Sequence, residues 1–300
     1  MSSTLFSDLY THSPIVDNIL SHIGSPQGRI HLSGLTGSML SVVGAATVAR
    51  TPDRNHLFIA GSKEEAYYLQ NDLETLLGEA EEDLDKKRVL LFPTTYRRPY
   101  QTEETDNANV LQRSEVVKQL NSGRKVAIVA YPEALCEKVI SSQTLTRHML
   151  EITKGSKVDI DFVLDVLMDY DFERVDFVVE PGQYALRGGI IDVFSFANEY
   201  PFRIEFFDDE VDSLRTFDPV SQLSIKPYEN ITIIPNLERR GEPSSPTMEL
   251  KQDKVPLLHY FHEEDCIWVS GLMIISERLE TLFANARTEF EKQKTTIAQL

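Results

Sequence analysis

Cysteine is scarce in this 300-residue chain, which contains only Cys136 and Cys266. Two thiols cannot build the disulfide framework of a small secreted domain. A cysteine content this low is typical of proteins in a reducing compartment. The chain also has no basic amino-terminal segment followed by a long apolar run, so no secretory signal is visible. Its most apolar stretch, CIWVSGLMII, is too short and too interrupted to cross a bilayer. We therefore expect a cytoplasmic protein with no membrane partner.

Positive charge is also in short supply. Lys and Arg total 30 against 47 Asp and Glu, which gives a formal net charge of −17. A chain this acidic is a poor candidate for wrapping nucleic acid by itself, because each phosphate contact needs a cation. The best local candidate is the run TTYRRPYQTEETD, where Arg97 and Arg98 stand beside two tyrosines. Its acidic residues oppose that interpretation, whereas a basic protein partner is compatible with the composition.

Up to residue 150 the pattern is that of an α/β domain. Short apolar runs (GRIHLSGL, HLFIAG, RVLLFP and KVAIVAYP) alternate with longer stretches of helical periodicity (SMLSVVGAATVAR, KEEAYYLQNDLETLL and VLQRSEVVKQLNSG). This alternation predicts a parallel sheet covered by helices on both faces. We take residues 1–150 as the first part of this domain.

The pattern changes near residue 151. One helix is expected after Asp159, a suitable N-cap, and it is followed by the strand-like runs RVDFVVE, QYALR, GIIDVFSF, FRIEFF, EVDSLRTFD and NITIIP. Residues 151–236 therefore read as an antiparallel α+β domain. A polar, proline-containing stretch follows, and then an apolar run (CIWVSG) and an amphipathic helix (SERLETLFANARTEFEK). We expect residues 237–300 to return to the first sheet.

The run GLTGSMLS stands where an ATPase carries its phosphate-binding loop. Such a loop reads G-x-x-x-x-G-K-[ST], in which glycines admit the phosphates, the lysine neutralises them and the hydroxyl holds magnesium. Gly34, Gly37 and Ser41 match the pattern, but Met39 replaces the second glycine and Leu40 replaces the lysine. We expect a surviving loop that binds no nucleotide, with Met39 and Leu40 used for packing. A chance run of small residues is the remaining alternative.

A longer signature lies in the antiparallel domain. The run QYALRGGIIDVFSFANEYPFRIEFFDDEVDSLRTFDPVSQLS resembles one shared by the excision-repair protein UvrB and the Mfd family of transcription-repair coupling factors. The matching positions are Tyr184, Arg187, Gly188, Ile191, Asp192, Phe194, Arg203, Glu205, Phe206, Phe207, Asp209, Glu210, Phe217, Asp218, Ser221 and Gln222. The resemblance implies a degenerate P-loop NTPase-like (RecA-like) parallel-sheet domain with an inserted antiparallel α+β domain, as in UvrB.

Two departures favour the coupling factors over UvrB. UvrB keeps the loop lysine and inserts a tyrosine-rich DNA-gripping hairpin, whereas this chain has Leu40 and a short acidic segment with Tyr96 and Tyr100 as its only aromatics. The resemblance then implies the N-terminal module of a longer protein, a non-catalytic adaptor without cofactor that recruits UvrA to stalled RNA polymerase. A UvrB-like ATPase that verifies damage is the alternative.

The remaining parts of such a longer protein are implied by the same resemblance. They would bind RNA polymerase and, as an ATP- and Mg²⁺-dependent translocase, DNA. A C-terminal domain would contact this module and cover its UvrA-binding face.

Charged residues of the antiparallel domain are the candidates for the UvrA contact. Arg187 comes first, because an arginine fork suits a carboxylate partner; an internal salt bridge to Asp192 is its alternative. Arg203 and Glu205 are two apart on a strand and should share a face, as contacts or as a solvated face. Three further candidates are Glu173, Arg174 and Tyr184.

Other side chains suit structural roles. The alternating pattern places the phenylalanines in the core: Phe194, Phe206, Phe207 and Phe217. The acidic run Asp208 to Asp212 is expected to be a charged hairpin turn rather than a metal or catalytic site. His259, His262 and Cys266 have loose metal-ligand spacing, but without a defined fourth ligand we expect no zinc.

Overall fold

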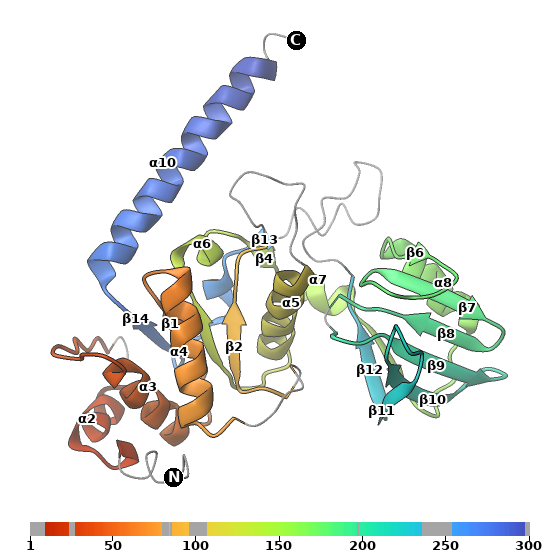
Figure 1. Cartoon of the computed structure of the whole chain (residues 1–300), viewed down its shortest axis with the longest axis horizontal. Helices are drawn as coiled ribbons and strands as arrows, with labels where there is room; N and C mark the ends of the chain where they lie inside the picture. Colours follow the sequence, from red (N-terminus) through yellow and green to blue (C-terminus); the bar gives the residue numbers. More distant parts are fainter. Residues whose placement is uncertain are drawn as a thin grey trace. The chain divides into compact units, whose positions relative to one another are not determined.

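A computed structural model describes residues 10–23, 28–79, 84, 86–95, 107–196, 198–235 and 254–297 (Figure 1). The chain divides into two compact units. The first comprises Met1–Thr94, Gly123–Glu137 and Pro256–Leu300, and the second comprises Thr95–Ser122 and Lys138–Val255. The second unit thus takes in residues 95–122, which the sequence pattern had placed with the first domain. The nucleic-acid candidates Tyr96 to Tyr100 lie outside the described residues, as does most of the polar stretch after residue 236.

The first unit is built on a four-stranded parallel sheet. Its strands are β1 (His56–Ile59), β2 (Val89–Phe92), β3 (Ala127–Ala130) and β14 (Cys266–Val269), in the order β14-β1-β3-β2. Every residue of β1, β2 and β3 is buried, which explains why these strands are continuous apolar runs. Strand β14 pairs with β1 in parallel, so the chain re-enters the first sheet after the second unit.

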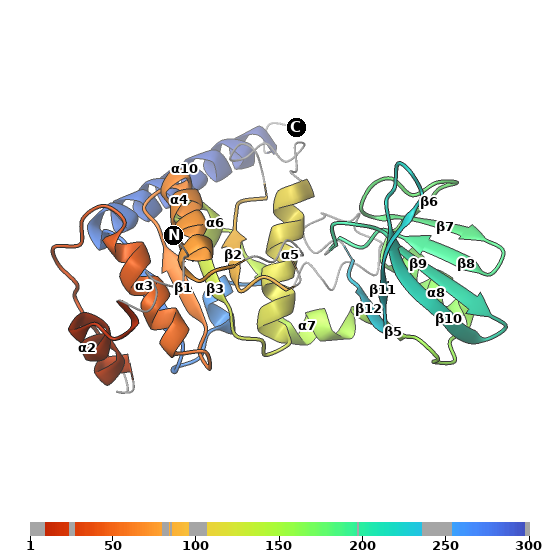
Figure 2. The same cartoon turned by 60° about the horizontal axis from the view of Figure 1, so that its bottom comes forward.

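Helices of the first unit are α2 (Pro14–Ile23), α3 (Met39–Arg50), α4 (Lys63–Leu76), α6 (Pro132–Leu135) and α10 (Leu272–Ile297), with a short 3₁₀ helix η1 (Leu257–Tyr260) (Figure 2). Helix α3 packs closely on β1 at Gly44, where an added Cβ would lie 2.8 Å from Cε1 of Phe58. Ser62 caps α4 by accepting a hydrogen bond from the backbone of Glu65 (3.2 Å). Within the described part of the chain, no helix combines the length and the apolarity needed to cross a membrane.

The strand predicted for residues 28–35 is absent. This segment is irregular and mostly exposed until α3 begins at Met39. Its apolar residues alternate as in a strand, yet among the described strands β14 pairs only with β1. A period-two pattern creates a strand only where a neighbouring strand supplies hydrogen bonds, and the sequence alone could not show that this one is unpaired.

A six-stranded sheet dominates the second unit, in the order β11-β10-β9-β8-β7-β6. Its strands are β6 (Glu173–Arg174), β7 (Gln183–Arg187), β8 (Ile190–Val193), β9 (Phe202–Phe207), β10 (Glu210–Phe217) and β11 (Ser224–Tyr228). All neighbours are antiparallel except β6 and β7. The expected helix is α8 (Ile160–Asp169), and Asp159 caps it by accepting from the backbone N–H of Asp161 (2.9 Å). The predicted α+β character is confirmed.

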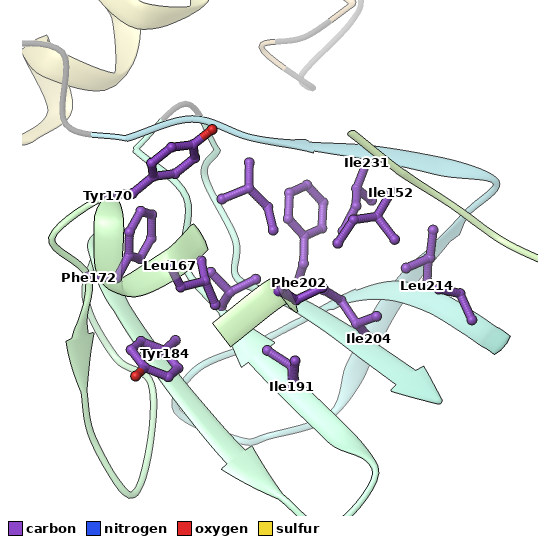
Figure 3. Packing of buried hydrophobic residues seen from close by; sticks show 14 residues of the cluster. Ile152, Leu167, Tyr170, Phe172, Tyr184, Ile191, Phe202, Ile204, Leu214 and Ile231 are labelled. Atoms are coloured by element: carbon purple, nitrogen blue, oxygen red, sulfur yellow. The ribbon is translucent and has the colours of Figure 1, made fainter. Parts of the chain in front are cut away.

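Smaller elements complete this unit. They are the pair β5 (Leu150–Thr153) and β12 (Asn230–Ile233), the pair β4 (Val139–Ile140) and β13 (Lys254–Val255), and helices α5 (Asn107–Asn121) and α7 (Ser142–Arg147). One face of the six-stranded sheet buries its apolar side chains against α8, β5 and β12. Figure 3 shows this core, in which Leu167 of α8 lies among Ile191, Phe202 and Ile204 of the sheet.

The predicted strand over residues 174–180 is largely wrong, because β6 ends at Arg174. Only part of the apolar run that follows is buried, and Phe177 and Val179 are exposed. Val178, with Val175 beside it, packs on Ala185 and Phe217 at the sheet face opposite α8. Burial of apolar side chains drives both arrangements, so a short apolar run does not reveal whether it pairs as a strand or lies across one.

Asn55 connects the amino-terminal ends of three parallel strands. It is buried, and its backbone N–H and side-chain amide both donate to the carboxylate of Asp265 (2.8 and 3.3 Å). Its carbonyl accepts from the N–H of Cys266 (2.9 Å), where β14 begins. Its side-chain oxygen accepts from the N–H of Val126 just before β3 (3.1 Å). One side chain therefore holds the register of β14, β1 and β3.

Replacing Asn55 with alanine is expected to lower the free energy of unfolding of the first unit by about 2 kcal/mol, because the buried N–H of Val126 loses its acceptor. Urea unfolding followed by the fluorescence of Trp268, the single tryptophan, measures the change. Asn71→Ala, at an exposed position of α4, is the matched control. Equal stability of the two variants would contradict the role given to Asn55.

Candidate functional site

The loop that resembles a phosphate cradle lies at the start of α3. Gly34 and Gly37 both have positive φ (77° and 57°), as a curled loop of this kind requires. Met39 and Leu40 are half-buried in the first turn of the helix. The hydroxyl of Ser41, the position that would hold magnesium, is buried and donates instead to Asp72 Oδ2 of α4 (2.8 Å). The backbone bends of a cradle are present, while its hydroxyl is engaged elsewhere.

A cleft of about 780 Å³ adjoins this loop. Among the residues that the structure describes, four carboxylic residues line it, namely Glu65, Asp72, Glu263 and Asp265, and no lysine or arginine does. A triphosphate is anionic, so these carboxylates repel what a loop lysine would attract. The cleft therefore disfavours a phosphate ligand for two reasons: the loop lysine is missing, and the carboxylates of the lining repel the phosphate charge.

The second unit presents a polar sheet face opposite α8, which we call the arginine face. Two rows of paired positions define it. One row runs from Ala185 through Asp192 and Arg203 to Arg215, and the other joins Arg187, Ile190 and Glu205. Paired residues of neighbouring strands point to the same side of a sheet, so the charged side chains of both rows gather on one surface. The prediction that Arg203 and Glu205 share a face is confirmed.

Asp192 lies at the centre of the arginine face and is fully buried. Its carboxylate accepts two hydrogen bonds from Arg203, from Nε to Oδ1 (2.6 Å) and from Nη2 to Oδ2 (2.8 Å). Arg187 also donates to Oδ2 through its own Nη2. One buried carboxylate thus orients two arginines, and the salt bridge considered as the alternative for Arg187 is present.

Arg203 is committed to the interior of its unit. Only 14% of its side chain is exposed. Beyond Asp192, its guanidinium donates to the side-chain oxygen of Gln222 (3.1 Å) and lies over the ring of Phe217 (4.2 Å to the centroid). Gln222 belongs to the turn between β10 and β11, so Arg203 holds that turn on the arginine face. Its geometry suits positioning better than direct contact.

Arg187 and Phe207 form the accessible end of this face. The Arg187 side chain is 40% exposed and lies over the ring of Phe177 (5.2 Å), which is itself exposed. Phe207 is 80% exposed, so its expected place in the core is wrong. It follows Glu205 by two residues and shares its face, whereas Phe206 packs against the core. Strand alternation by itself forbids two successive residues from sharing the buried face.

Glu205 does not pair with Arg203. Its carboxylate accepts from Arg215 Nη2 and from the hydroxyl of Ser213 (2.7 Å). These hydrogen bonds, that from Arg215 first, lower the pKa of Glu205 to about 2. The group is therefore ionised at neutral pH and its charge is paired with that of Arg215, at a position between Arg187 and Phe207.

The other predicted contacts are less central. Tyr184 is 4% exposed and belongs to the core on the opposite face, among the side chains of Figure 3, so its placement does not suit a direct contact. Glu173 and Arg174 are both exposed on β6. Their partners across the sheet are Gln183 and Tyr184, which places Glu173 on the arginine face and Arg174 on the other.

The acidic run is a hairpin turn between β9 and β10, as expected. Asp208 has a positive φ (58°), and Asp209 pairs with Lys157 (3.2 Å). Over the described ranges, no group of three or more His, Cys, Asp or Glu side chains is arranged to hold a metal ion. Near β14, the backbone N–H of His262 donates to Asp265 (3.0 Å), which fixes the short turn before the strand.

Comparison with known proteins finds a family match within the second unit. Residues 150–238 match the model described as the UvrB interaction domain, and this range contains the whole arginine face. The transcription-repair-coupling factor of Bacillus subtilis (strain 168) is 30% identical over 207 residues, which are 69% of this chain and 17% of that protein. That of Haemophilus influenzae is 31% identical over 153 residues, 51% of this chain and 13% of that protein.

The corresponding factor of Escherichia coli (strain K12) is 32% identical over 137 residues, 46% of this chain and 12% of that protein. The matched part of this chain therefore spans less than a fifth of each of these relatives.

Proposed function

Because this chain is related to the transcription-repair-coupling factors and contains a UvrB interaction domain, we propose that it is a non-catalytic adaptor that recruits UvrA. The observation that carries the proposal is the arginine face. A buried carboxylate there fixes two arginines, and Arg187, Glu205 and Phe207 end on one accessible surface. Arginine and aromatic side chains on a rigid support are the usual anchors of protein interfaces.

We expect the arginine face to contact UvrA through both charged and apolar interactions. The free N–H groups of Arg187 suit a carboxylate of the partner, and the exposed ring of Phe207 suits an apolar pocket. Glu205 is already paired with Arg215, so its carboxylate offers a partner only the acceptor positions that Arg215 and Ser213 leave open. Arg203 would act through Asp192 by keeping Arg187 in place, and Glu173 lies on the same face as a peripheral contact.

Purified UvrA should bind the chain in calorimetry. Arg187→Ala and Phe207→Ala should each weaken binding about 20-fold, which is about 1.8 kcal/mol. Arg287→Ala and Phe283→Ala, at exposed positions of α10, are matched controls and should leave the affinity unchanged. No binding by the intact chain would contradict the adaptor function. Binding that survives both replacements would contradict only the site.

The competing function is a UvrB-like ATPase. It would use the parallel sheet of the first unit, which we infer to be a degenerate P-loop NTPase domain. Met39, Leu40 and the acidic cleft argue against it, as does the bond from Ser41 to Asp72. Equilibrium dialysis with ATP and Mg²⁺ should detect no binding at about 1 mM nucleotide, since the loop supplies no cation. A micromolar dissociation constant would restore the ATPase.

The role of the longer protein belongs to the same proposal. The coupling factors named above are longer than the matched segment, and we infer that this chain acts in the cytoplasm as the repair-recruiting part of such a factor. RNA polymerase, DNA and ATP with Mg²⁺ would be bound by other parts of that protein. A C-terminal domain that covers the arginine face would make UvrA bind this chain more tightly than the full-length protein.

A further inference from the structure

Over the described ranges, the first unit has an open sheet edge at β14. Backbone N–H groups of Cys266 and Ser270 donate toward β1, to the carbonyls of Asn55 (2.9 Å) and Ile59 (3.0 Å). Backbone groups alternate sides along a strand, so those of Ile267 and Val269 point away from β1. These two residues are 51% and 42% exposed, and among the described residues their outward groups have no backbone partner.

The cleft beside the former phosphate loop runs along this edge. Ile267 and Val269 line it, together with Trp268 from the same strand. Further apolar walls come from Ile30 in the irregular segment, Tyr68 of α4 and Leu272 of α10, all of which are exposed. An unpaired edge beside exposed apolar side chains is the arrangement to which extended peptides add as a further strand.

The charge of the cleft selects the occupant. The part of its lining that the structure describes contains carboxylic residues and no lysine or arginine. Asp72 accepts from Ser41, and Asp265 is engaged with Asn55 and paired with Lys125 (3.8 Å), whereas exposed Glu263 has no hydrogen bond or ion pair among the described residues. A second copy of this chain would set the same carboxylates against one another, which disfavours pairing of β14 with itself. A cationic peptide carries a charge opposite to that of the cleft carboxylates and is therefore attracted to them.

We propose that the β14 edge and its cleft bind an extended segment of another protein, in which apolar residues alternate with lysine or arginine. The peptide backbone pairs with the outward groups of Ile267 and Val269. Its apolar side chains enter the cleft, and its cations face Glu65 and Glu263. This surface lies in the first unit and is separate from the arginine face, so it goes beyond UvrA recruitment.

A short fluorescein-labelled peptide in which lysine alternates with valine is the probe. Fluorescence anisotropy with the full chain should show saturable binding. The same peptide with N-methylated backbone amides on its pairing edge should bind at least tenfold more weakly, because it cannot donate to β14. Equal affinity of the two peptides would overturn the proposal by showing that charge alone attracts the probe.

Val269→Pro tests the edge from the protein side, because it removes only an N–H that points outward, a position where an edge strand tolerates proline. We expect at least a tenfold loss of affinity, whereas Val269→Thr, which keeps the N–H, should stay within twofold. Affinity unchanged by the proline variant would overturn the proposal.

Hydrogen exchange on the unaltered chain tests the same claim without a mutation. The amides of Ile267 and Val269 should exchange freely without the peptide and become at least tenfold slower with it. Protection in the absence of peptide would overturn the proposal, because it would mean that the edge is already paired.

Discussion

Replacing Asp192 with alanine is expected to lower the free energy of unfolding of the second unit by about 3–5 kcal/mol, because the change leaves buried cationic groups without their counter-charge. Arg203 is the source of most of this effect, since it is largely enclosed and, within the described part of the chain, keeps only Gln222 and the ring of Phe217 as partners. The Arg187 side chain can turn into solvent, which limits its contribution to the loss in the free energy of unfolding. The charge network of the arginine face is therefore also a structural element.

The single tryptophan lies in the first unit, so Asp192→Ala must be followed by a probe of the second. Hydrogen exchange at the amides of β8 and β9 during urea titration serves this purpose. Asp212→Ala, an exposed aspartate on the neighbouring strand β10, is the matched control and should change stability by less than about 0.5 kcal/mol. If the two variants unfold at the same urea concentration, the buried carboxylate does not hold the sheet.

Acidification should destabilise the first unit through His56. The ring is fully buried, and burial is the main reason that its pKa is lowered from 6.5 to about 4. Trp268 Nε1–H donates to Nδ1 (3.1 Å), so Nε2 carries the proton and donates to the hydroxyl of Thr51 (2.8 Å). The neutral imidazole has both partners that it needs, and a second proton has no acceptor there.

The sign of the effect follows from the lowered pKa. As pH falls below about 6.5, the unfolded chain binds a proton that the folded chain does not, so stability is lost until the pH reaches about 4. Between about pH 7.5 and pH 4.5 this loss amounts to about 2.5 kcal/mol. Urea unfolding followed by Trp268 fluorescence measures it.

The comparison variant for this experiment is His56→Gln, which cannot titrate. Its stability at neutral pH should be lower, because the ring that stacks with Phe58 and Trp268 is lost, but its decline on acidification should be smaller than that of the native chain by about the same 2.5 kcal/mol. Parallel pH curves for the two proteins would show that another group causes the acid sensitivity.

Much of the fold could be predicted because burial leaves a direct mark on the sequence. Strands β1, β2 and β3 are enclosed on both faces and appear as unbroken apolar runs. The cap at Asp159 and the hairpin turn after Phe207 depend on neighbours in the chain, so they too could be recognised. Their causes are local, and local causes survive in a sequence.

The predictions that were wrong depend on residues that are distant in the sequence. Residues 28–35 carry a strand pattern, and whether they pair depends on an edge formed by residues more than two hundred positions away. Val178 is buried by packing on Ala185 of β7 and on Phe217 rather than by extending the sheet. Neither outcome is a property of the segment itself.

The candidate site divides in the same way. The residue types and the spacing of two along β9 determined that Arg203 and Glu205 would share a face, and the missing lysine at position 40 removed the cation of a phosphate loop. Only the tertiary structure decided which arginine is enclosed and which is accessible. That choice depends on where Asp192 lies between two neighbouring strands, and burial and electrostatic pairing are set by distance in space, which the order of residues does not contain.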